Sequence, residues 1–204
     1  VVTRRQRQMC IRDRLTRQQP ANSDIKDAVK ALLGAKKAVI WAGQGVLFGG
    51  ATAELKELAE LTGIPVFCTM PGKSAFNETH PLSLGAGSGA APKGAIHFLR
   101  ESDVMLCLGS SLTRTFYNQP VPPGKFLIHN SNNPDDINKD EAVDIGLVGD
   151  AKLTIQAMID EVKAQIGAGG VGDAAEVKAE VAALKKEWMD EWMPLFTSNE
   201  TPIN

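Results

Sequence analysis

The stretch that decides the fold is AKKAVIWAGQGVLFGGATAELKELAELTGIPVF, residues 35–67. Its short apolar run AVIW stops at Gly43, a glycine-rich turn follows, and the next segment carries apolar residues at helical spacing up to Gly63. Glycine at that point is typical of a helix that ends in a left-handed cap. A second apolar run, Ile64 to Phe67, completes a strand–helix–strand unit. Such a unit has parallel strands with the helix on one face of the sheet.

The rest of the chain extends this pattern. Apolar runs predict further strands at 103–108, 125–129 and 143–148, and helical spacing predicts helices at 24–33 (with Ser23 as N-cap), 93–101, 151–166 and 173–193. Residues 82–92 are expected to be a glycine-rich loop, and residues 167–172 a flexible linker. We therefore predict an α/β fold. Its core is a doubly wound, mostly parallel, five- or six-stranded Rossmann-like sheet with helices on both faces, followed by a C-terminal linker helix.

Composition favours a soluble globular protein. Of the 204 residues, 43% are hydrophobic and 23% are charged. No apolar run approaches the roughly 20 residues that a membrane-spanning helix needs. Cys10, Cys68 and Cys107 form no CxxC pair, so we interpret them as small core residues rather than as disulfides or metal ligands. These features predict a cytoplasmic protein that binds no membrane.

The charge is distributed unevenly. Residues 1–20 carry six arginines and one aspartate, a net charge of +5, whereas the remainder carries −7 and does not suggest a nucleic-acid partner. The basic head has no helical periodicity and lacks the apolar centre of a signal peptide. Such a basic head could be a transit peptide or an RNA-binding arm. We favour a third interpretation, a non-native stretch of translated sequencing adapter, and leave residues 1–20 out of the predicted fold.

Glycine stands at the end of several predicted strands, at Gly43, Gly109 and Gly149. Ligands of open α/β sheets bind at the carboxyl ends of the strands, where glycine allows close approach and leaves amides free for an anion. The alternative is that each glycine only makes a tight turn. The turn after the first strand departs from the GxGxxG fingerprint. Phe67 and Cys68 occupy the place of its ribose-binding acid, so a standard NAD site is not predicted.

Catalytic patterns are absent from the sequence. His80, His97 and His129 lie far apart, without metal-ligand spacing, and are interpreted as structural. The acid pairs Asp135-Asp136 and Asp140-Glu141 are expected to face solvent in a loop. No serine lies in a GxSxG turn, and no nucleophile–base pair is recognisable. The sequence therefore predicts neither a catalytic residue nor a metal site in this chain.

Taken as one string, residues 35–161 resemble the central domain of thiamine-diphosphate-dependent enzymes, in particular the acetolactate synthase and decarboxylase group. The most specific part is GKSAFNETHPLSLG, residues 72–85, which corresponds to the family's GKG-x-x-x-E-x-HP-LxxG. The other matching segments, in the family's order, are AKKAVIWAGQGV, ESDVMLCLGSSL, KFLIHNSNNPDDINK and VDIGLVGDAKLTI. The resemblance implies a fragment with the central domain at 21–166, and with the linker helix and the start of a missing C-terminal domain at 167–204.

The resemblance also implies what the parent enzyme does. It would be a lyase or transferase that uses thiamine diphosphate and Mg²⁺ to decarboxylate or ligate 2-oxo acids. A missing N-terminal domain would supply a cofactor-activating glutamate, and a missing C-terminal domain a GDG…N motif. Gly149-Asp150 is followed by Ala151 and is not that motif. Both cofactor sites would lie outside this chain, which would not be catalytic alone and would belong to a homo-oligomer, a dimer or a tetramer.

In relatives this central domain holds FAD, an adenine nucleotide such as ADP, or nothing. The positions that would contact such a cofactor are Gly43, Gly45, Thr69, Met70, Gly87, Gly109, Ser111, Arg114, Ser131 and Asn133. Ser111 stands where flavin-binding relatives carry an arginine, and Ser131 and Asn133 where they carry acids. These departures argue against bound FAD. Binding of FAD or ADP by this domain is nevertheless kept as an open alternative. Arg114 is either a phosphate partner or a solvated loop residue.

Two other functions fit the same sequence. The chain could be a freestanding, non-catalytic module that binds ADP or FAD, or a scaffold domain that only contacts other proteins. The central domain of a thiamine-diphosphate enzyme is the function that we favour.

Overall fold

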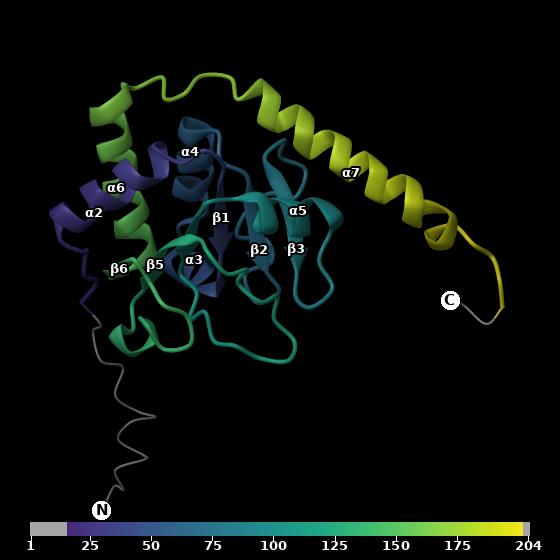
Figure 1. The fold of residues 1–204 in the computed structure, drawn as a ribbon, viewed down its shortest axis with the longest axis horizontal. Helices are drawn as coiled ribbons and strands as arrows, with labels where there is room; N and C mark the ends of the chain where they lie inside the picture. The colour runs from purple at the N-terminus through teal and green to yellow at the C-terminus, as the bar shows by residue number, and fades with distance from the viewer. Residues whose placement is uncertain (1–15, 202–204) are drawn as a thin grey trace, which may run out of the picture.

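A computed structural model describes residues 16–201 of the chain. Strands and helices alternate along most of this range (Figure 1), in the order α2 Asn22–Leu33, β1 Ala38–Ala42, α3 Gln44–Gly49, α4 Thr52–Thr62, β2 Val66–Thr69, β3 Ser83–Gly87, α5 Lys93–Glu101, β4 Val104–Leu108, β5 Phe126–Ser131, the 3-10 turn η1 Pro134–Asp136, β6 Ile145–Val148, α6 Ala151–Ile166 and α7 Ala175–Phe196. Most of the basic head, including Cys10, lies outside the described residues.

The strands of the described range form one six-stranded sheet in the order β3-β2-β1-β4-β5-β6. All five pairings between neighbouring strands are parallel. The order runs outward from β1 in one direction and from β4 in the other, so the winding of the chain reverses between these two neighbours. The prediction of a doubly wound, Rossmann-like sheet is confirmed.

The central strands are buried on both faces, as parallel strands covered by helices are. In β1, Ile40 and Ala42 belong to one core cluster, and Val39 and Trp41 belong to the other. None of these four residues is more than 4% exposed. Because both faces are covered, AVIWA is a continuous apolar run instead of alternating with polar residues.

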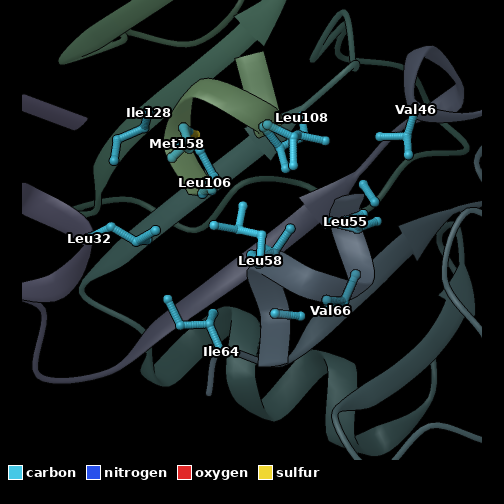
Figure 2. Packing of buried hydrophobic residues seen from close by; sticks show 14 of the residues in the cluster. Leu32, Val46, Leu55, Leu58, Ile64, Val66, Leu106, Leu108, Ile128 and Met158 are labelled. Carbon is cyan, nitrogen blue, oxygen red and sulfur yellow. The ribbon is translucent and has the colours of Figure 1, made fainter. Parts of the chain in front are cut away.

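The larger core cluster lies between the sheet and helices α2, α4 and α6 (Figure 2). Leu32 of α2, Leu58 of α4 and Met158 of α6 belong to it, together with Leu106 and Ile128 of the sheet. Burial of each such side chain contributes roughly 1.5–3 kcal/mol. This face supplies most of the apolar burial that holds the sheet in place.

The second cluster lies under α5 and the first half of α7. Phe67 and Met105 of the sheet meet Phe98 of α5 and Val181 of α7 there. The later part of α7 continues away from the body (Figure 1), and its Phe196 is 60% exposed. Helices thus cover both faces, as predicted, and α7 is docked only over its first half.

Two glycine-rich stretches differ from the prediction. Residues 82–92, expected to be a loop, contain the edge strand β3, which backbone hydrogen bonds hold against β2, beginning with Val66 N to Leu82 O at 2.9 Å. Leu84 of this strand is buried in the second core cluster, but Gly85 and Gly87 interrupt the apolar run and are typical of a loop, so sequence patterning missed the strand. The turn after β1 contains the short helix α3, which ends at Gly50 with a φ of +64°.

The ends of the N-terminal helix and of the linker also differ. α2 begins at Asn22 with Ala21 as its N-cap, so Ser23 is not the cap; its hydroxyl bonds the Asp24 carboxylate instead. Residues 167–172, predicted to be a flexible linker, contact α4, because the Val171 amide donates to Leu61 O at 2.9 Å. In the linker, a tertiary contact overrides the local signal of the glycines.

Candidate functional site

A crevice of about 1130 Å³ lies where the winding of the sheet reverses. Open α/β sheets bind ligands at the carboxyl ends of their strands beside such a point. The turns that follow β1, β4, β5 and β6 line the crevice, together with residues 16–18 and the loop that follows β4. The topology alone therefore marks this crevice as the candidate binding site.

The glycines at the floor of the crevice pack against one another. The Gly45 amide donates to Gly109 O at 2.8 Å, and the Gly43 amide donates to Leu108 O at 2.8 Å. A Cβ on Gly45 would lie 2.7 Å from Gly109 Cα, and Gly109 itself has a φ of +58°. These glycines let the turn after β1 pass close to the turn after β4. The amides of Gly43 and Gly45 are consumed by this packing.

Asn130, at the end of β5, ties the surrounding elements together. Its fully buried amide Nδ2 lies 2.9 Å from Leu147 O, 3.0 Å from Gly149 O and 3.1 Å from Thr154 Oγ1, and donates to these acceptors. Its Oδ1 accepts from the Gly109 amide at 3.2 Å. One side chain thus joins the ends of β4 and β6 to helix α6. Satisfied buried networks of this kind make a site rigid.

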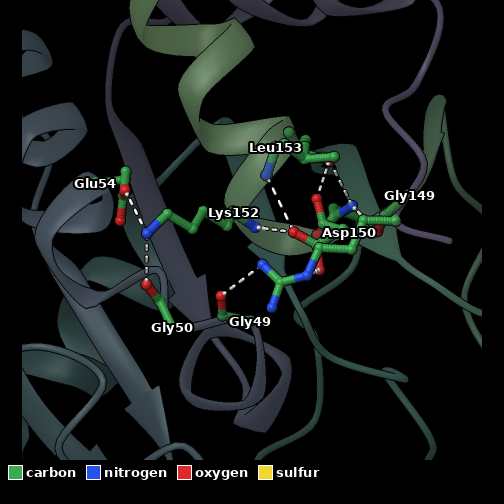
Figure 3. Close-up of polar contacts among 10 residues, drawn as sticks. Gly49, Gly50, Glu54, Gly149, Asp150, Lys152 and Leu153 are labelled. Carbon is green, nitrogen blue, oxygen red and sulfur yellow. Dashed lines mark hydrogen bonds and ion pairs between the residues drawn. The ribbon is translucent and has the colours of Figure 1, made fainter. Parts of the chain in front are cut away.

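Asp150 caps helix α6 at the edge of the crevice (Figure 3). Its Oδ1 accepts from the amides of Lys152 at 3.0 Å and Leu153 at 3.2 Å. Arg17 lies with its Nε 3.7 Å from Asp150 Oδ2, and its Nη1 donates to Gly49 O at 3.2 Å. The positive end of α6 is therefore already paired with a carboxylate of the chain itself.

Lys152 links the start of α6 to helices α3 and α4 (Figure 3). Its Nζ donates to Gly50 O at 3.2 Å and lies 3.0 Å from Glu54 Oε1. Burial opposes the ionisation of Glu54, but the hydrogen bond and the charge of Lys152 outweigh it and lower the pKa of Glu54. This contact holds the turn after β1 against α6, on one side of the crevice.

A second ion pair closes the opposite side. Arg114 donates to both oxygens of Glu141, from Nε at 2.7 Å and from Nη2 at 2.9 Å, and its amide donates to Asp140 Oδ2 at 3.0 Å. The hydrogen bond and charge of Glu141 raise the pKa of Arg114. The Glu141 side chain is only 12% exposed. The expectation that Asp140-Glu141 faces solvent is therefore wrong for Glu141.

Trp41 and His129 carry buried polar atoms on the α5 face of the sheet. Trp41 lines the crevice, is 4% exposed, and packs edge to face on Phe67 at 5.2 Å between ring centroids. His129 donates from Nε2 to Ser110 O at 2.6 Å, and burial lowers its pKa, so the ring is neutral at pH 7. Within the described residues neither Trp41 Nε1 nor His129 Nδ1 has a hydrogen-bond partner. Each unpaired buried group costs about 1–3 kcal/mol.

The structure brings most of the predicted contact residues together. Those that line the crevice are Gly43, Gly45, Thr69, Gly109, Ser111, Arg114 and Ser131. Met70, Gly87 and Asn133 do not line it. Met70 is exposed, Gly87 packs on Ala91, and the Asn133 side chain accepts from the Asp135 amide. The assignment of these positions to cofactor binding remains a prediction.

Sequence reasoning did not single out Trp41, Asn130, Glu141 or Asp150 as residues of the site. Asp150 carried a usable signal, because an aspartate after a strand and before a helical pattern is typical of an N-cap. Glu141 carried none, since its partner lies 27 residues away. Trp41 is indistinguishable from an ordinary core residue in its strand.

The charged groups of the crevice do not fit the diphosphate of FAD or ADP. Both guanidinium groups, Arg17 and Arg114, are paired with carboxylates, and the Gly45 amide is taken by Gly109. The carboxylates that line the crevice are Asp136, Glu141 and Asp150, one more than the guanidinium groups. A diphosphate placed here would have to displace an existing ion pair and would lie among carboxylates.

Several hydroxyl groups of the crevice are engaged in structural bonds. Ser110 Oγ accepts from the Leu112 amide, Ser111 bonds Thr113, and Ser131 donates to Asp136 at 2.7 Å. No group of three or more potential metal ligands occurs within residues 16–201. This arrangement offers binding contacts but no activated nucleophile.

The family is decided by comparison with known proteins. Residues 25–158, more than half of the chain, match the family described as "Thiamine pyrophosphate enzyme, central domain". The chain belongs to this family. The family predicted from the sequence is thereby confirmed.

The relatives of this central domain are much longer than the part that it matches. It is 38% identical to a probable acetolactate synthase large subunit of Methanococcus aeolicus over 68% of the chain and 23% of that protein. It is 30% identical to a sulfoacetaldehyde acetyltransferase of Roseovarius nubinhibens over 87% of the chain and 30% of that protein. The chain thus spans about a quarter of the length of the curated relatives that it matches.

A solved structure shares the fold. Benzoylformate decarboxylase from Polynucleobacter necessarius superposes with a TM-score of 0.61 at 23% identity, covering 72% of this chain and 28% of that one.

Among the helices between residues 16 and 201, none combines the length and hydropathy of a bilayer-spanning helix.

Proposed function

We propose that this central domain is the spacer of a thiamine-diphosphate- and Mg²⁺-dependent enzyme that decarboxylates or ligates 2-oxo acids, and that the reaction takes place elsewhere in that enzyme. The observation that carries the proposal is the family match over residues 25–158. The acetolactate synthase and acetyltransferase relatives support a lyase or transferase as the parent. Thiamine diphosphate supplies a carbanion-stabilising ring, and the protein supplies its orientation and electrostatics.

The contacts within the chain support a spacer role. Polar side chains at the carboxyl edge of the sheet join strand ends and helices to one another, as Asn130 and Lys152 do. They support a rigid domain, and the described residues that line the crevice include no histidine or lysine paired with a carboxylate for proton transfer. We infer that thiamine diphosphate and Mg²⁺ are held by other domains of the parent, and that the parent is a cytoplasmic homo-oligomer, a dimer or a tetramer.

The gene that encodes this chain tests the proposal. We expect the extended reading frame to encode an upstream domain with the cofactor-activating glutamate and a downstream domain with GDG…N. A stop codon soon after position 204, with no such domain on either side, would contradict it. That result would favour the freestanding ADP- or FAD-binding module, which no observation here supports independently.

A further inference from the structure

Helix α7 carries an aromatic stripe, formed by Trp188, Trp192 and Phe196, that the body of the domain does not cover. We propose that this stripe packs on the domain that follows residue 204 in the same polypeptide, so that α7 is shared between two domains and fixes their relative orientation. This shared packing rests on the proposed function, which places a further domain downstream of the chain.

The first half of α7 makes an ordinary core contact on the same face of the helix. Val181 is 1% exposed and belongs to the second core cluster, against which Val177 and Leu184 are partly buried. At 3.6 residues per turn, the aromatic stripe lies on the same side of the helix as these three residues. One apolar face therefore runs along α7, and its second half continues away from the body (Figure 1).

The second half of this face is exposed in the described part of the chain. Trp192 is 39% exposed, and Met193, Leu195 and Phe196 beside it are more exposed still. The ring centroids of Trp188 and Trp192 lie 6.4 Å apart, as do those of Trp192 and Phe196, so the three rings form one continuous surface. A contiguous exposed apolar surface marks an interaction site, and aromatic side chains are enriched at the centre of protein interfaces.

The position of α7 in the chain indicates what covers the stripe. The family domain ends at residue 158, so the whole helix lies after it. The match to the Roseovarius nubinhibens protein covers 87% of the chain, more than residues 1–158 can supply, and only 30% of that protein. Similarity therefore continues past the family domain, in a much longer relative. A helix that leaves the central domain with half of its apolar face uncovered is suited to receive the next domain.

The contacts of α7 also define the chemistry of the surface that it meets. The three stacked rings require an apolar surface, and an indole N–H is a donor only, so that surface should offer acceptors close to Trp188 and Trp192. The first half of the helix is held to the body by the ion pairs Lys37–Glu180 and Lys93–Glu187. Because one rigid helix is held at both ends, the two domains cannot turn freely about the linker.

Photo-crosslinking in the enzyme encoded by the complete gene identifies the occupant. The variant Trp192→benzoylphenylalanine is irradiated, and the joined peptides are identified by mass spectrometry. Enzyme assembled from ¹⁵N-labelled and unlabelled subunits separates crosslinks within one chain from crosslinks between subunits. We expect position 192 to join a peptide beyond residue 204 of the same chain. Asp190→benzoylphenylalanine, on the opposite side of the helix, is the matched control and should give at most about a tenth of that yield.

Hydroxyl-radical footprinting of the unmodified proteins keeps the test valid if the crosslinking variants do not fold. We expect oxidation of Trp192 to be at least about fivefold slower in the complete enzyme than in the 204-residue chain, because the centre of an interface is fully buried. Trp41, which is buried in the core, should be protected in both proteins and reports that each is folded.

The possible failures are distinguishable. If the gene encodes a downstream domain but position 192 joins only another subunit, or only residues 16–201, the shared packing is overturned and the proposed function stands. Equal oxidation of Trp192 in the two proteins would have the same consequence. A stop codon soon after position 204 would overturn the shared packing and the proposed function together.

Discussion

Replacing Asn130 by alanine should lower the stability of the chain more than replacing an exposed asparagine by alanine does. The change leaves the Gly109 amide without an acceptor, which costs about 1–3 kcal/mol for a buried donor. It also removes bonds to Leu147 O, Gly149 O and Thr154 Oγ1. Two amide hydrogens serve these acceptors, so we count about two bonds of 0.5–1.5 kcal/mol. The free energy of unfolding should fall by about 3 kcal/mol, and Tm by about 6–12 °C.

Urea unfolding followed by circular dichroism measures this loss. The matched control is Asn118→Ala, because the exposed side-chain amide of Asn118 makes a single hydrogen bond, to Thr113 O, and we expect a loss below about 0.5 kcal/mol. Asn130→Asp keeps the shape but turns an oxygen toward carbonyl oxygens, so it should cost more than alanine. A loss below about 1 kcal/mol for Asn130→Ala, at an unchanged denaturant slope, would refute the role assigned to this side chain.

Three further predictions rest on other parts of the structure. Gly109→Ala should lower the free energy of unfolding by at least about 2 kcal/mol more than Gly124→Ala does. Both glycines have a positive φ, but only Gly109 packs on a neighbouring backbone. Equal losses of stability in thermal melts would contradict this prediction. Burial opposes the ionisation of Glu180, but hydrogen bonds from Lys37 and His97 lower the pKa of this carboxyl group below 4.5. Its contribution to stability is therefore complete above pH 4.5 and lost as the pH falls through the lowered value, so Glu180→Gln should flatten the decrease of Tm between pH 5 and pH 3, and an unchanged slope would count against this pairing. Burial raises the pKa of the Cys68 thiol to about 11 and raises that of Cys107 well above its usual range. In a Cys10→Ser variant, neither thiol should therefore react with a disulfide reagent at pH 8 until urea unfolds the chain. Rapid reaction of the folded variant would contradict the burial of these two cysteines.

Most of the sheet could be predicted from the sequence because its central strands are buried on both faces and are therefore unbroken apolar runs. β3 could not, since Gly85 and Gly87 make Ser83–Gly87 look like a loop although Leu84 is buried in the core. The start of α2 could not either: the helix begins one residue before Ser23, after the buried Pro20 that lies against Gly149, and its N-cap Ala21 makes no side-chain bond.

The location of the crevice followed from glycines at strand ends, but its chemistry did not. Gly43 and Gly109 mark the point where the winding reverses, and the structure uses them for close packing of two turns. Glu141 reaches Arg114 across 27 residues, a contact without any periodic signal. Asn130 looks like an ordinary polar residue after a strand until its four partners are seen. Contacts between distant segments determine what this crevice can hold, and such contacts are invisible to local patterns.

The most direct test compares turnover by the 204-residue chain with turnover by the enzyme encoded in the complete gene. Both proteins are given thiamine diphosphate, Mg²⁺ and a panel of 2-oxo acids, and carbon dioxide release and product formation are measured. We expect the complete enzyme to consume at least one 2-oxo acid and the central domain alone to remain at the uncatalysed rate. Turnover by the isolated chain above that rate would contradict the proposal that the reaction takes place outside this chain.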